Sequence, residues 1–429
     1  IINAVDIAAE IGLGNRINMI MQAAFFKLSQ VIPLKQAINL LKESIVKAYG
    51  RKGEKIVAMN QQAVDEGLHA LIKVEVPQEW ANCPLEPTEA AEDIPKFIKE
   101  IAEPINAQQG DKLPVSAFVG REDGSFPLGT TAYEKRGVAV NVPDWLPDNC
   151  IQCNQCSYVC PHAAIRPVLL TDEEKEAAPG GFVTKNALGR PLKGLHYRIQ
   201  VSPYDCTGCG NCVVTCPAKE TALVMRPLEE LLTQESKNWD YAVKVPAKPG
   251  LWNLHSVKGS QFAQPLLEFS GACAGCGETP YVKLLTQLFG DRLVIANATG
   301  CSSIWGGSAP SIPYCKNEKG QGPAWANSLF EDNAEYGYGM TLGAKHIRRK
   351  IADLMTTALK EDLPTDLKSA FEKWLAAKDQ GTASREATDT LRPLLSKYED
   401  LEIIQEIIAK QDFLVKPSNW VIGGDGWAY

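Results

Sequence analysis

The sequence predicts a multidomain protein that combines α/β and α+β regions. Its 429 residues exceed what one ordinary hydrophobic core supports, so about two to four domains are expected. Hydrophobic periodicities typical of helices and strands fill both ends of the chain. Between these ends lie two cysteine runs of identical spacing, which contain eight of the 13 cysteines. The periodic ends and the cysteine-rich centre indicate parts with separate chemical roles.

Charge and hydropathy narrow the classes of partner and compartment. The chain has 44 basic and 51 acidic residues and no basic block, so no nucleic-acid partner is expected. Its longest uncharged stretch, 293–315, is rich in Gly, Ser, Pro and Asn, so no membrane span is expected. The cysteine spacings, without a secretory signal, predict a cytoplasmic protein rather than a disulfide framework. Because the chain starts at Ile1 and stops at Tyr429 after a glycine-rich strand end, we expect a fragment of a longer polypeptide.

Residues 1–76 have an α/β pattern. Apolar residues at three- and four-residue intervals after Pro33 predict a helix that ends before Gly53. A second helix is predicted over 53–70. Alternating apolar and polar residues over 71–76 predict a strand.

Residues 77–147 contain nine prolines and few periodic segments. We therefore expect a connector, or a small domain poor in regular structure. Within it, Glu134, Lys135 and Arg136 are consecutive, and composition alone favours a solvated run of charges.

Two cysteine runs in residues 138–246 each follow the pattern C-x2-C-x2-C-x3-C-P. In bacterial two-cluster ferredoxins, the first three cysteines of such a run bind one [4Fe–4S] cluster and the fourth binds the other. Zinc is the alternative, but four-cysteine zinc sites usually come as paired C-x2-C knuckles. Gly208 and Gly210 leave backbone N–H groups free to approach sulfur, and Pro161 and Pro217 suit the turns after the fourth cysteines. The predicted ligand sets are Cys150, Cys153, Cys156 and Cys216 for one cluster, and Cys206, Cys209, Cys212 and Cys160 for the other.

Residues 247–429 return to an α/β pattern. A short apolar strand is predicted over 293–296 and another over 420–422. Residues 361–410 are predicted to form a mostly helical insertion with a polar exterior. Between the two cysteine runs, 167–197 is predicted to be an inserted loop or helix.

A third group of cysteines follows the two runs. Cys273 and Cys276 form an isolated C-x2-C, which is ambiguous among a zinc site, a redox dithiol and a cluster. Cys301 follows in a loop rich in Gly and Ser, and Cys315 is the only nearby candidate for a fourth ligand. Cys315 and Cys83 are otherwise expected to be buried, inert thiols.

Gly424, Asp425 and Gly426 follow the last predicted strand. Ligands of parallel α/β sheets bind at the carboxyl ends of strands, glycine lets the backbone approach phosphate, and aspartate binds Mg²⁺. The triplet therefore suggests a metal–diphosphate site, although ordinary strand-to-turn junctions look the same.

Several motifs occur in one order along the chain: GNRINMIMQAAFFK, the EKR segment, the two cysteine runs, CAGCGETP, ATGCSSIWG and GDGWAY. In this combination the chain resembles the pyruvate:ferredoxin (flavodoxin) oxidoreductases of the single-chain, homodimeric type. The resemblance covers essentially the whole chain. It implies the C-terminal part of a Rossmann-like (gamma-type) domain at 1–80, an EKR connector domain at 81–137, a two-cluster ferredoxin-type domain at 138–246, and the N-terminal part of a thiamine diphosphate domain at 247–429.

That resemblance implies oxidative decarboxylation of pyruvate with coenzyme A to acetyl-CoA and CO2. Electrons would pass through three [4Fe–4S] clusters to ferredoxin or flavodoxin, and the fragment alone would be inactive. The cofactors would be the clusters, thiamine diphosphate and Mg²⁺. The implied residues are Cys273, Cys276 and Cys301 for a proximal cluster whose fourth ligand lies beyond residue 429; Glu278, Cys301, Gly424, Asp425, Gly426 and Trp427 for thiamine diphosphate; Asp425 for Mg²⁺; and Asn18 and Asn60 for coenzyme A, where a helix cap or turn is an open alternative.

Two other functions stay open from the sequence. One is a related oxidoreductase that acts on a different 2-oxo acid. The other is a non-catalytic, polyferredoxin-like electron carrier, which would explain 138–246 but not the CAGCGE and GDGWAY motifs.

Overall fold

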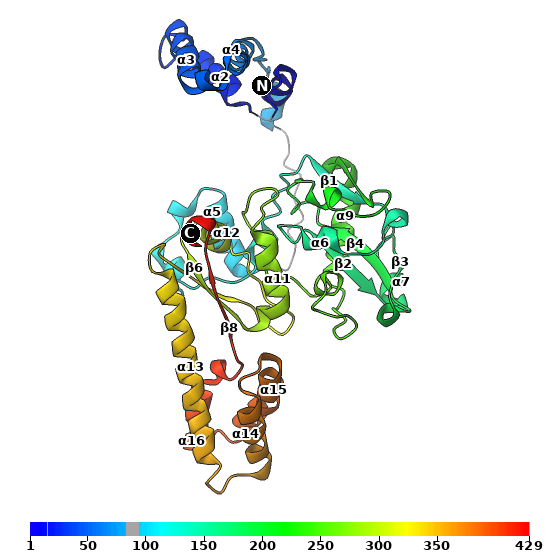
Figure 1. The fold of residues 1–429 in the computed structure, drawn as a ribbon, viewed down its shortest axis with the longest axis vertical. Coiled ribbons are helices and arrows are strands. Elements are labelled where there is room, and N and C mark those ends of the chain that lie inside the picture. Colours follow the sequence, from blue (N-terminus) through cyan, green and yellow to red (C-terminus); the bar gives the residue numbers. More distant parts are fainter. Residues whose placement is uncertain (15, 83–93, 429) are drawn as a thin grey trace. The chain divides into compact units, whose positions relative to one another are not determined.

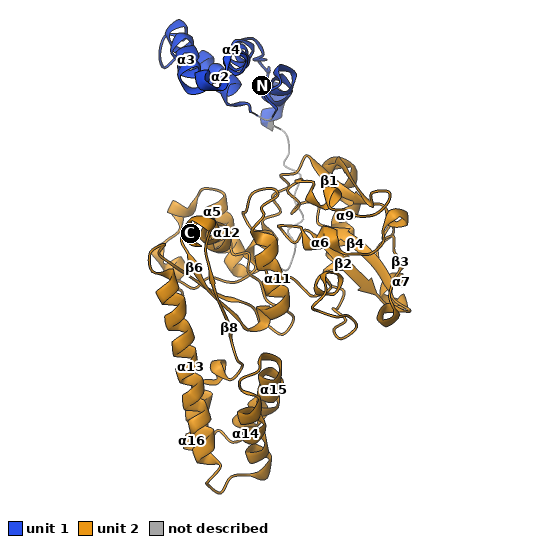
Figure 2. Ribbon diagram, in the orientation of Figure 1, with its two compact units in different colours: residues 1–91 blue, residues 92–429 orange. Residues whose placement is uncertain are grey.

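The computed structural model describes residues 1–14, 16–82 and 94–428. They form two compact units, 1–91 and 92–429 (Figure 2). In these ranges, every helix is either too short or too polar to cross a lipid bilayer.

The first unit is helical, with α2 packed along α4 (Figure 1). Its core includes Ile20, Ile45 and Val64. Gly67 allows the close approach of the two helices, because a Cβ there would lie 2.5 Å from the carbonyl oxygen of Ile20. The helices predicted after Pro33 and over 53–70 are confirmed. The four helices described in this unit are α1 (Ala4–Ile11), α2 (Asn18–Ser29), α3 (Leu34–Tyr49) and α4 (Glu54–His69).

The strand predicted over 71–76 is wrong, and the described part of 1–76 is helical rather than α/β. Only Ile72 pairs in a sheet-like manner: its N–H donates to the Ile1 carbonyl at 2.9 Å, and the Ile1 amino group donates to the Ile72 carbonyl at 2.7 Å. A strand needs a neighbour several residues long, and this pairing is confined to one residue. The alternation instead marks an extended segment with exposed side chains such as Val76.

From residue 94 to 137 the chain forms short helical turns, as the prolines predicted. A π-helical turn, Ile98–Ala102, leads into α5 (Glu103–Asn106). Phe97, Ile98 and Ile101 form a small hydrophobic core of their own.

The cysteine-rich segment consists of two antiparallel sheets, and each cysteine run connects one sheet to the other (Figure 1). The first run lies between β1 and β2, and the second between β4 and β5. Because β1 pairs with β5, and β2 with β4, the end of each run returns toward the other run. The prediction of an inserted loop or helix over 167–197 is correct only in part: the range contains α7, but also β3, most of β2 and the start of β4, which pair in one sheet. The elements are β1 (Asn141–Trp145), α6 (Gln155–Tyr158), β2 (Ile165–Leu170), α7 (Asp172–Glu176), β3 (Lys185–Asn186), β4 (His196–Val201), α8 (Asn211–Val214), β5 (Leu223–Pro227) and α9 (Leu228–Ala242).

The last part of the second unit contains a parallel sheet in the order β7-β6-β8. Two of its strands, β6 (Leu293–Ala298) and β8 (Ser418–Ile422), confirm the strands predicted over 293–296 and 420–422. The third is β7 (Ala324–Ser328). Helix α11 (Thr279–Phe289) precedes β6, α12 (Cys301–Gly307) follows it, and α17 (Asp425–Ala428) follows β8. Parallel pairing places the starts of α12 and α17 at the same edge of the sheet.

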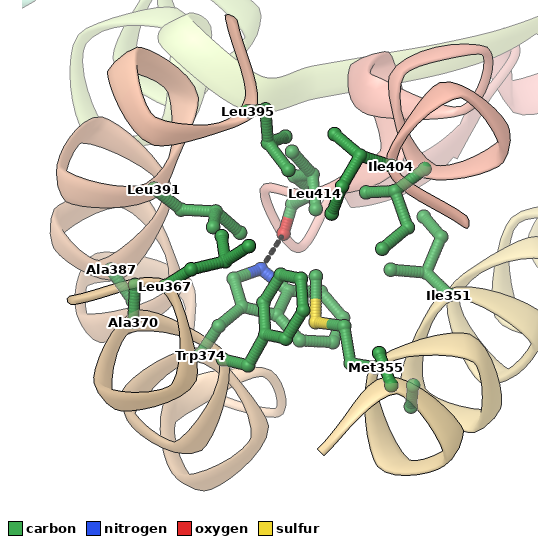
Figure 3. Close-up of a cluster of buried hydrophobic side chains, with 14 of the residues drawn as sticks. Ile351, Met355, Leu367, Ala370, Trp374, Ala387, Leu391, Leu395, Ile404 and Leu414 are labelled. Atoms are coloured by element: carbon green, nitrogen blue, oxygen red, sulfur yellow. Dashed lines mark hydrogen bonds between the residues drawn. The ribbon is translucent and has the colours of Figure 1, made fainter. Parts of the chain in front are cut away.

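The helical insertion predicted over 361–410 is confirmed. Its core surrounds Trp374, whose indole N–H donates to the Leu414 carbonyl at 3.0 Å (Figure 3). Ile351 and Met355 of the long helix α13 pack against the same core (Figure 3). The insertion contains α14 (Thr365–Ala377), α15 (Gly381–Lys397) and α16 (Glu402–Ile408), and α13 (Asn333–Ala358) precedes it.

Candidate functional site

The cysteine-rich segment contains two small hollows lined by cysteines, named here the first and the second cysteine cavity. Trp145, Tyr197 and Leu223 supply apolar wall to the first. The sulfur-bearing residues are Cys150, Cys153, Cys156 and Cys216 around the first, and Cys160, Cys206, Cys209 and Cys212 around the second. The structure therefore brings the fourth cysteine of each run together with the first three of the other run.

Four thiols around a cavity suit a cluster better than a zinc ion. Zinc holds its thiolates about 2.3 Å from one central point, which leaves no empty space between them. Within the described ranges, no three His, Cys, Asp or Glu side chains are grouped around a position for a single metal ion. The set of four thiols at each cavity fits the ligands of a [4Fe–4S] cluster.

Burial raises the pKa of the Cys206 thiol to about 12. It also raises the pKa of Cys156 and Cys212 far above the usual range for thiols, and neighbouring cysteines add to the effect. Metal binding requires thiolates, so loading these sites must release protons.

The two loops that carry the cysteines share a backbone path. In both loops, the backbone adopts left-handed φ angles at the second and the fourth residue after the first cysteine. The φ angles are +57° at Gln152 and +62° at Asn154 in the first loop, and +69° at Gly208 and +76° at Gly210 in the second. The Gly208 N–H donates to the Cys206 sulfur at 3.4 Å.

Gln152 and Asn154 hold the first loop against its neighbours. The Gln152 amide donates to the Asn186 carbonyl and accepts from the Leu188 N–H, both at 2.8 Å. The Asn154 side chain accepts from the Tyr197 hydroxyl at 2.7 Å. The sequence analysis missed both residues, although their alignment with the glycines of the second run was visible.

The third group of cysteines lies at the surface. Cys273 and Cys301 are exposed and Cys276 is half-buried. The Cys276 N–H donates to the Cys273 carbonyl at 3.1 Å and closes a tight turn. Cys315 is buried as predicted, and burial raises its thiol pKa above the usual range. Cys83 lies outside the described residues.

Glu278, which precedes α11, lies near α12. The Trp305 indole N–H donates to Glu278 Oε2 at 3.3 Å. In the described part of the chain, Glu278 Oε1 and the Tyr314 hydroxyl are both buried without a hydrogen-bond partner. Burial, with the nearby Glu278 carboxylate, raises the pKa of Tyr314 above its usual range. Unpaired buried polar atoms need a ligand or water, so Glu278 fits a hydrogen bond to a bound cofactor.

Asp425 is the first residue of α17 and is exposed. The chain before it is closely packed, since a Cβ at Gly423 would lie 2.5 Å from the Trp427 ring and 3.1 Å from the Ala298 side chain. The neighbouring strand β6 leads into Cys301. Asp425 and Cys301 therefore start helices at the same edge of the sheet, where ligands of parallel sheets bind.

Four family descriptions match parts of the chain. Both cysteine runs lie in the segment that matches a 4Fe-4S dicluster domain, 148–220. Residues 1–70 match pyruvate ferredoxin/flavodoxin oxidoreductase, 347–403 match the pyruvate-ferredoxin oxidoreductase insertion domain, and 85–139 match EKR, a domain of unknown function.

Several relatives align with the entire chain, among them the following three. The pyruvate:ferredoxin oxidoreductase of Moorella thermoacetica is 56% identical, and the chain covers 37% of it. The pyruvate-flavodoxin oxidoreductase of Klebsiella pneumoniae is 53% identical, with 36% covered. The whole chain is thus similar to part of the pyruvate:ferredoxin/flavodoxin oxidoreductases. The mitochondrial pyruvate dehydrogenase [NADP(+)] of Euglena gracilis is 48% identical, with 24% covered. The chain thus spans about a third of the length of the ferredoxin- and flavodoxin-linked relatives.

The charges of the EKR segment form ion pairs, which composition alone did not predict. The Lys135 ammonium donates to Asp205 at 2.6 Å, and the Asp205 side chain is only 3% exposed. Arg136 pairs with Glu134, and Glu134 also accepts a hydrogen bond from Ser311. Lys135 and Arg136 remain exposed, at 38% and 39% of their side chains, so the run is solvated as predicted but also paired.

His162 joins the second cysteine cavity to the Cys273 loop. It lies two residues after Cys160, and its Nε2–H donates to the carbonyl of Ala272 at 2.9 Å. Its Nδ1 accepts from the hydroxyl of Thr207, the neighbour of Cys206, at 3.3 Å. The sequence analysis missed this residue, since no local pattern distinguishes it.

The two asparagines implied for coenzyme A lie in the first unit and differ in exposure. Asn18 is exposed at the first position of α2. Asn60 is buried in α4, where its amide donates to the Ile56 carbonyl at 2.8 Å. The local helix thus accounts for the Asn60 side chain, whereas Asn18 is free to contact a ligand.

Proposed function

We propose that the protein containing this chain oxidises pyruvate with coenzyme A to acetyl-CoA and CO2, and passes the electrons through [4Fe–4S] clusters to ferredoxin or flavodoxin. The observation that carries the proposal is the connection through His162 from the second cysteine cavity to the Cys273 loop. A simple electron carrier has no need of that connection. An enzyme that draws electrons from a site near Glu278 does.

The eight cysteines around the two cavities are the proposed ligands of two clusters. Cys273, Cys276 and Cys301 are the proposed ligands of a third cluster, nearest the reacting carbon. Their exposure in this chain leaves room for a fourth ligand from elsewhere in the protein. The His162 bridge then shortens the through-bond route from the third cluster to the second cysteine cavity.

Thiamine diphosphate, when bound, supplies the carbanion chemistry of the decarboxylation. The free oxygen of Glu278 is the proposed acceptor for a hydrogen bond from this cofactor. The indole of Trp305 keeps the carboxylate oriented through its other oxygen. Asp425 is the proposed Mg²⁺ ligand. The backbone around Asp425 approaches the diphosphate, with Gly424, Gly426, Trp427 and Cys301 also proposed as contacts.

The remaining assignments complete the proposal. Residues 1–80 are proposed as part of a Rossmann-like domain that contributes Asn18 and Asn60 to coenzyme A binding. Residues 81–137 form the EKR connector, 138–246 the ferredoxin-type domain, and 247–429 the start of the thiamine diphosphate domain. The protein is proposed to be a cytoplasmic homodimer.

The test is an anaerobic preparation of the gene product that contains this sequence. We expect dye reduction that requires both pyruvate and coenzyme A, with about twelve iron atoms per chain, four for each cluster. About eight iron atoms and no pyruvate-dependent reduction would favour a polyferredoxin-like carrier. Parallel assays with 2-oxoglutarate, 2-oxoisovalerate and indolepyruvate decide between pyruvate and another 2-oxo acid. The name of the Euglena relative contains NADP⁺. The assay of electron acceptors therefore tests NADP⁺ as well as ferredoxin and flavodoxin.

A further inference from the structure

Lys283 of α11 is a buried cation beside the cysteine-rich segment. Its side chain is 1% exposed. The ammonium donates to the carbonyl oxygens of Ser157, of Tyr158 at 3.2 Å and of Cys160 at 3.0 Å. These three bonds use all the donors of the ammonium group. They do not neutralise its charge.

The described residues supply no carboxylate partner for Lys283 within salt-bridge distance. Arg166, the nearby charge of the same sign, is itself paired with Glu268. An uncompensated buried charge is costly, so this position calls for negative charge from a bound group.

The position of the ammonium indicates where that negative charge comes from. Its acceptors lie on the turn between Cys156 and Cys160. Cys156 lines the first cysteine cavity and Cys160 lines the second. A [4Fe–4S] cluster with four thiolate ligands carries net negative charge, and each one-electron reduction adds one more. Lys283 is therefore adjacent to ligands of both proposed clusters.

We propose that Lys283 is a positioning residue shared by the two clusters, which holds the turn from Ser157 to Cys160 and makes both reduction potentials more positive. The inference rests on the proposed assignment of the eight cysteines. The reason is electrostatic, since a nearby positive charge stabilises the more negative, reduced form of each cluster. Because Lys283 lies on α11, the same contact joins the ferredoxin-type segment to the helix that Glu278 precedes.

The test compares Lys283→Met with Lys283→Arg in the anaerobic gene product. Iron content and potentiometric titration followed by electron paramagnetic resonance are measured for each variant. In the methionine variant, we expect the equilibrium constant for reduction of both clusters to fall about tenfold, a shift of about 59 mV. The arginine variant keeps the charge, and its potentials should stay close to those of the parent protein. Lys345→Met removes an exposed charge as the matched control and should shift neither potential.

Unchanged potentials in a fully loaded methionine variant would overturn the proposal. Loss of iron from the methionine variant, with retention in the arginine variant, would support the positioning role. If both lose iron, Lys283→Gln keeps an N–H donor without charge, and unchanged potentials there would also overturn the proposal. If the parent protein itself lacked the two ferredoxin-type resonance signals, the assignment of the eight cysteines would be wrong. That outcome is distinguishable from unchanged potentials in the methionine variant.

Discussion

The two cysteine loops have the same spacing and the same backbone turns, yet they use different residues at the turns. The second loop uses Gly208 and Gly210, which adopt positive φ at little cost. The first loop uses Gln152 and Asn154, whose side chains bind neighbouring segments. The comparison teaches that placing three thiols of one loop around a cavity dictates the backbone path. The side chains at the turns remain available to fasten the loop to its surroundings.

The largest effect is expected from variants that test the crossed assignment, in which the fourth cysteine of each run binds the cluster of the other run. Cys216→Ser should abolish the cluster of the first run, although Cys216 belongs to the second run. Cys160→Ser should abolish the cluster of the second run, although Cys160 belongs to the first run. Each variant should lose about four iron atoms per chain and one of two ferredoxin-type resonance signals.

Cys315→Ser is the matched control for both cysteine variants. Cys315 is buried away from the two cysteine cavities, and a hydroxyl can keep its hydrogen bond to the Pro265 carbonyl. Its iron content should equal that of the parent protein. If Cys216→Ser removed the cluster of its own run instead, the crossed assignment would be wrong.

The next effect concerns the crowded turn of the second loop. At Gly208, a Cβ would lie 3.0 Å from the Asn141 carbonyl oxygen, and the φ of +69° disfavours any other residue. Gly208→Ala should lower the free energy of unfolding by about 3 kcal/mol, measured by thermal unfolding without oxygen. Gly210→Asn copies the residue of the first loop where a Cβ has open space, and should cost less than about 1 kcal/mol. Equal losses in both variants would contradict this distinction.

A smaller effect is expected when the first loop is given a glycine. Asn154→Gly suits the positive φ but leaves the buried Tyr197 hydroxyl without its acceptor. The free energy of unfolding should fall by about 2 kcal/mol. Hydrogen exchange should also rise around Lys258, whose carbonyl accepts from the Asn154 amide at 2.8 Å. A variant as stable as the parent would mean that these side chains do not fasten the loop.

Much of the fold could be predicted where local patterns were long or chemically specific. The apolar spacing after Pro33 predicted α3, and the short apolar runs predicted β6 and β8. The strand over 71–76 failed, because alternation cannot supply the second strand that a sheet requires. Cys301 and Asp425 follow two neighbouring parallel strands, β6 and β8, so the sheet places both residues at the same edge.

The sequence by itself predicted the two cysteine sets that line the two cavities, because the spacing of each run is typical of two-cluster ferredoxins. Only the tertiary structure assigned partners to the isolated charges. Lys135 meets Asp205 across 70 positions, and Lys283 meets Ser157 across 126. Such pairs leave no periodic trace in the sequence. The energy of a buried charge depends on the groups that surround it in space, and folding alone brings those groups together.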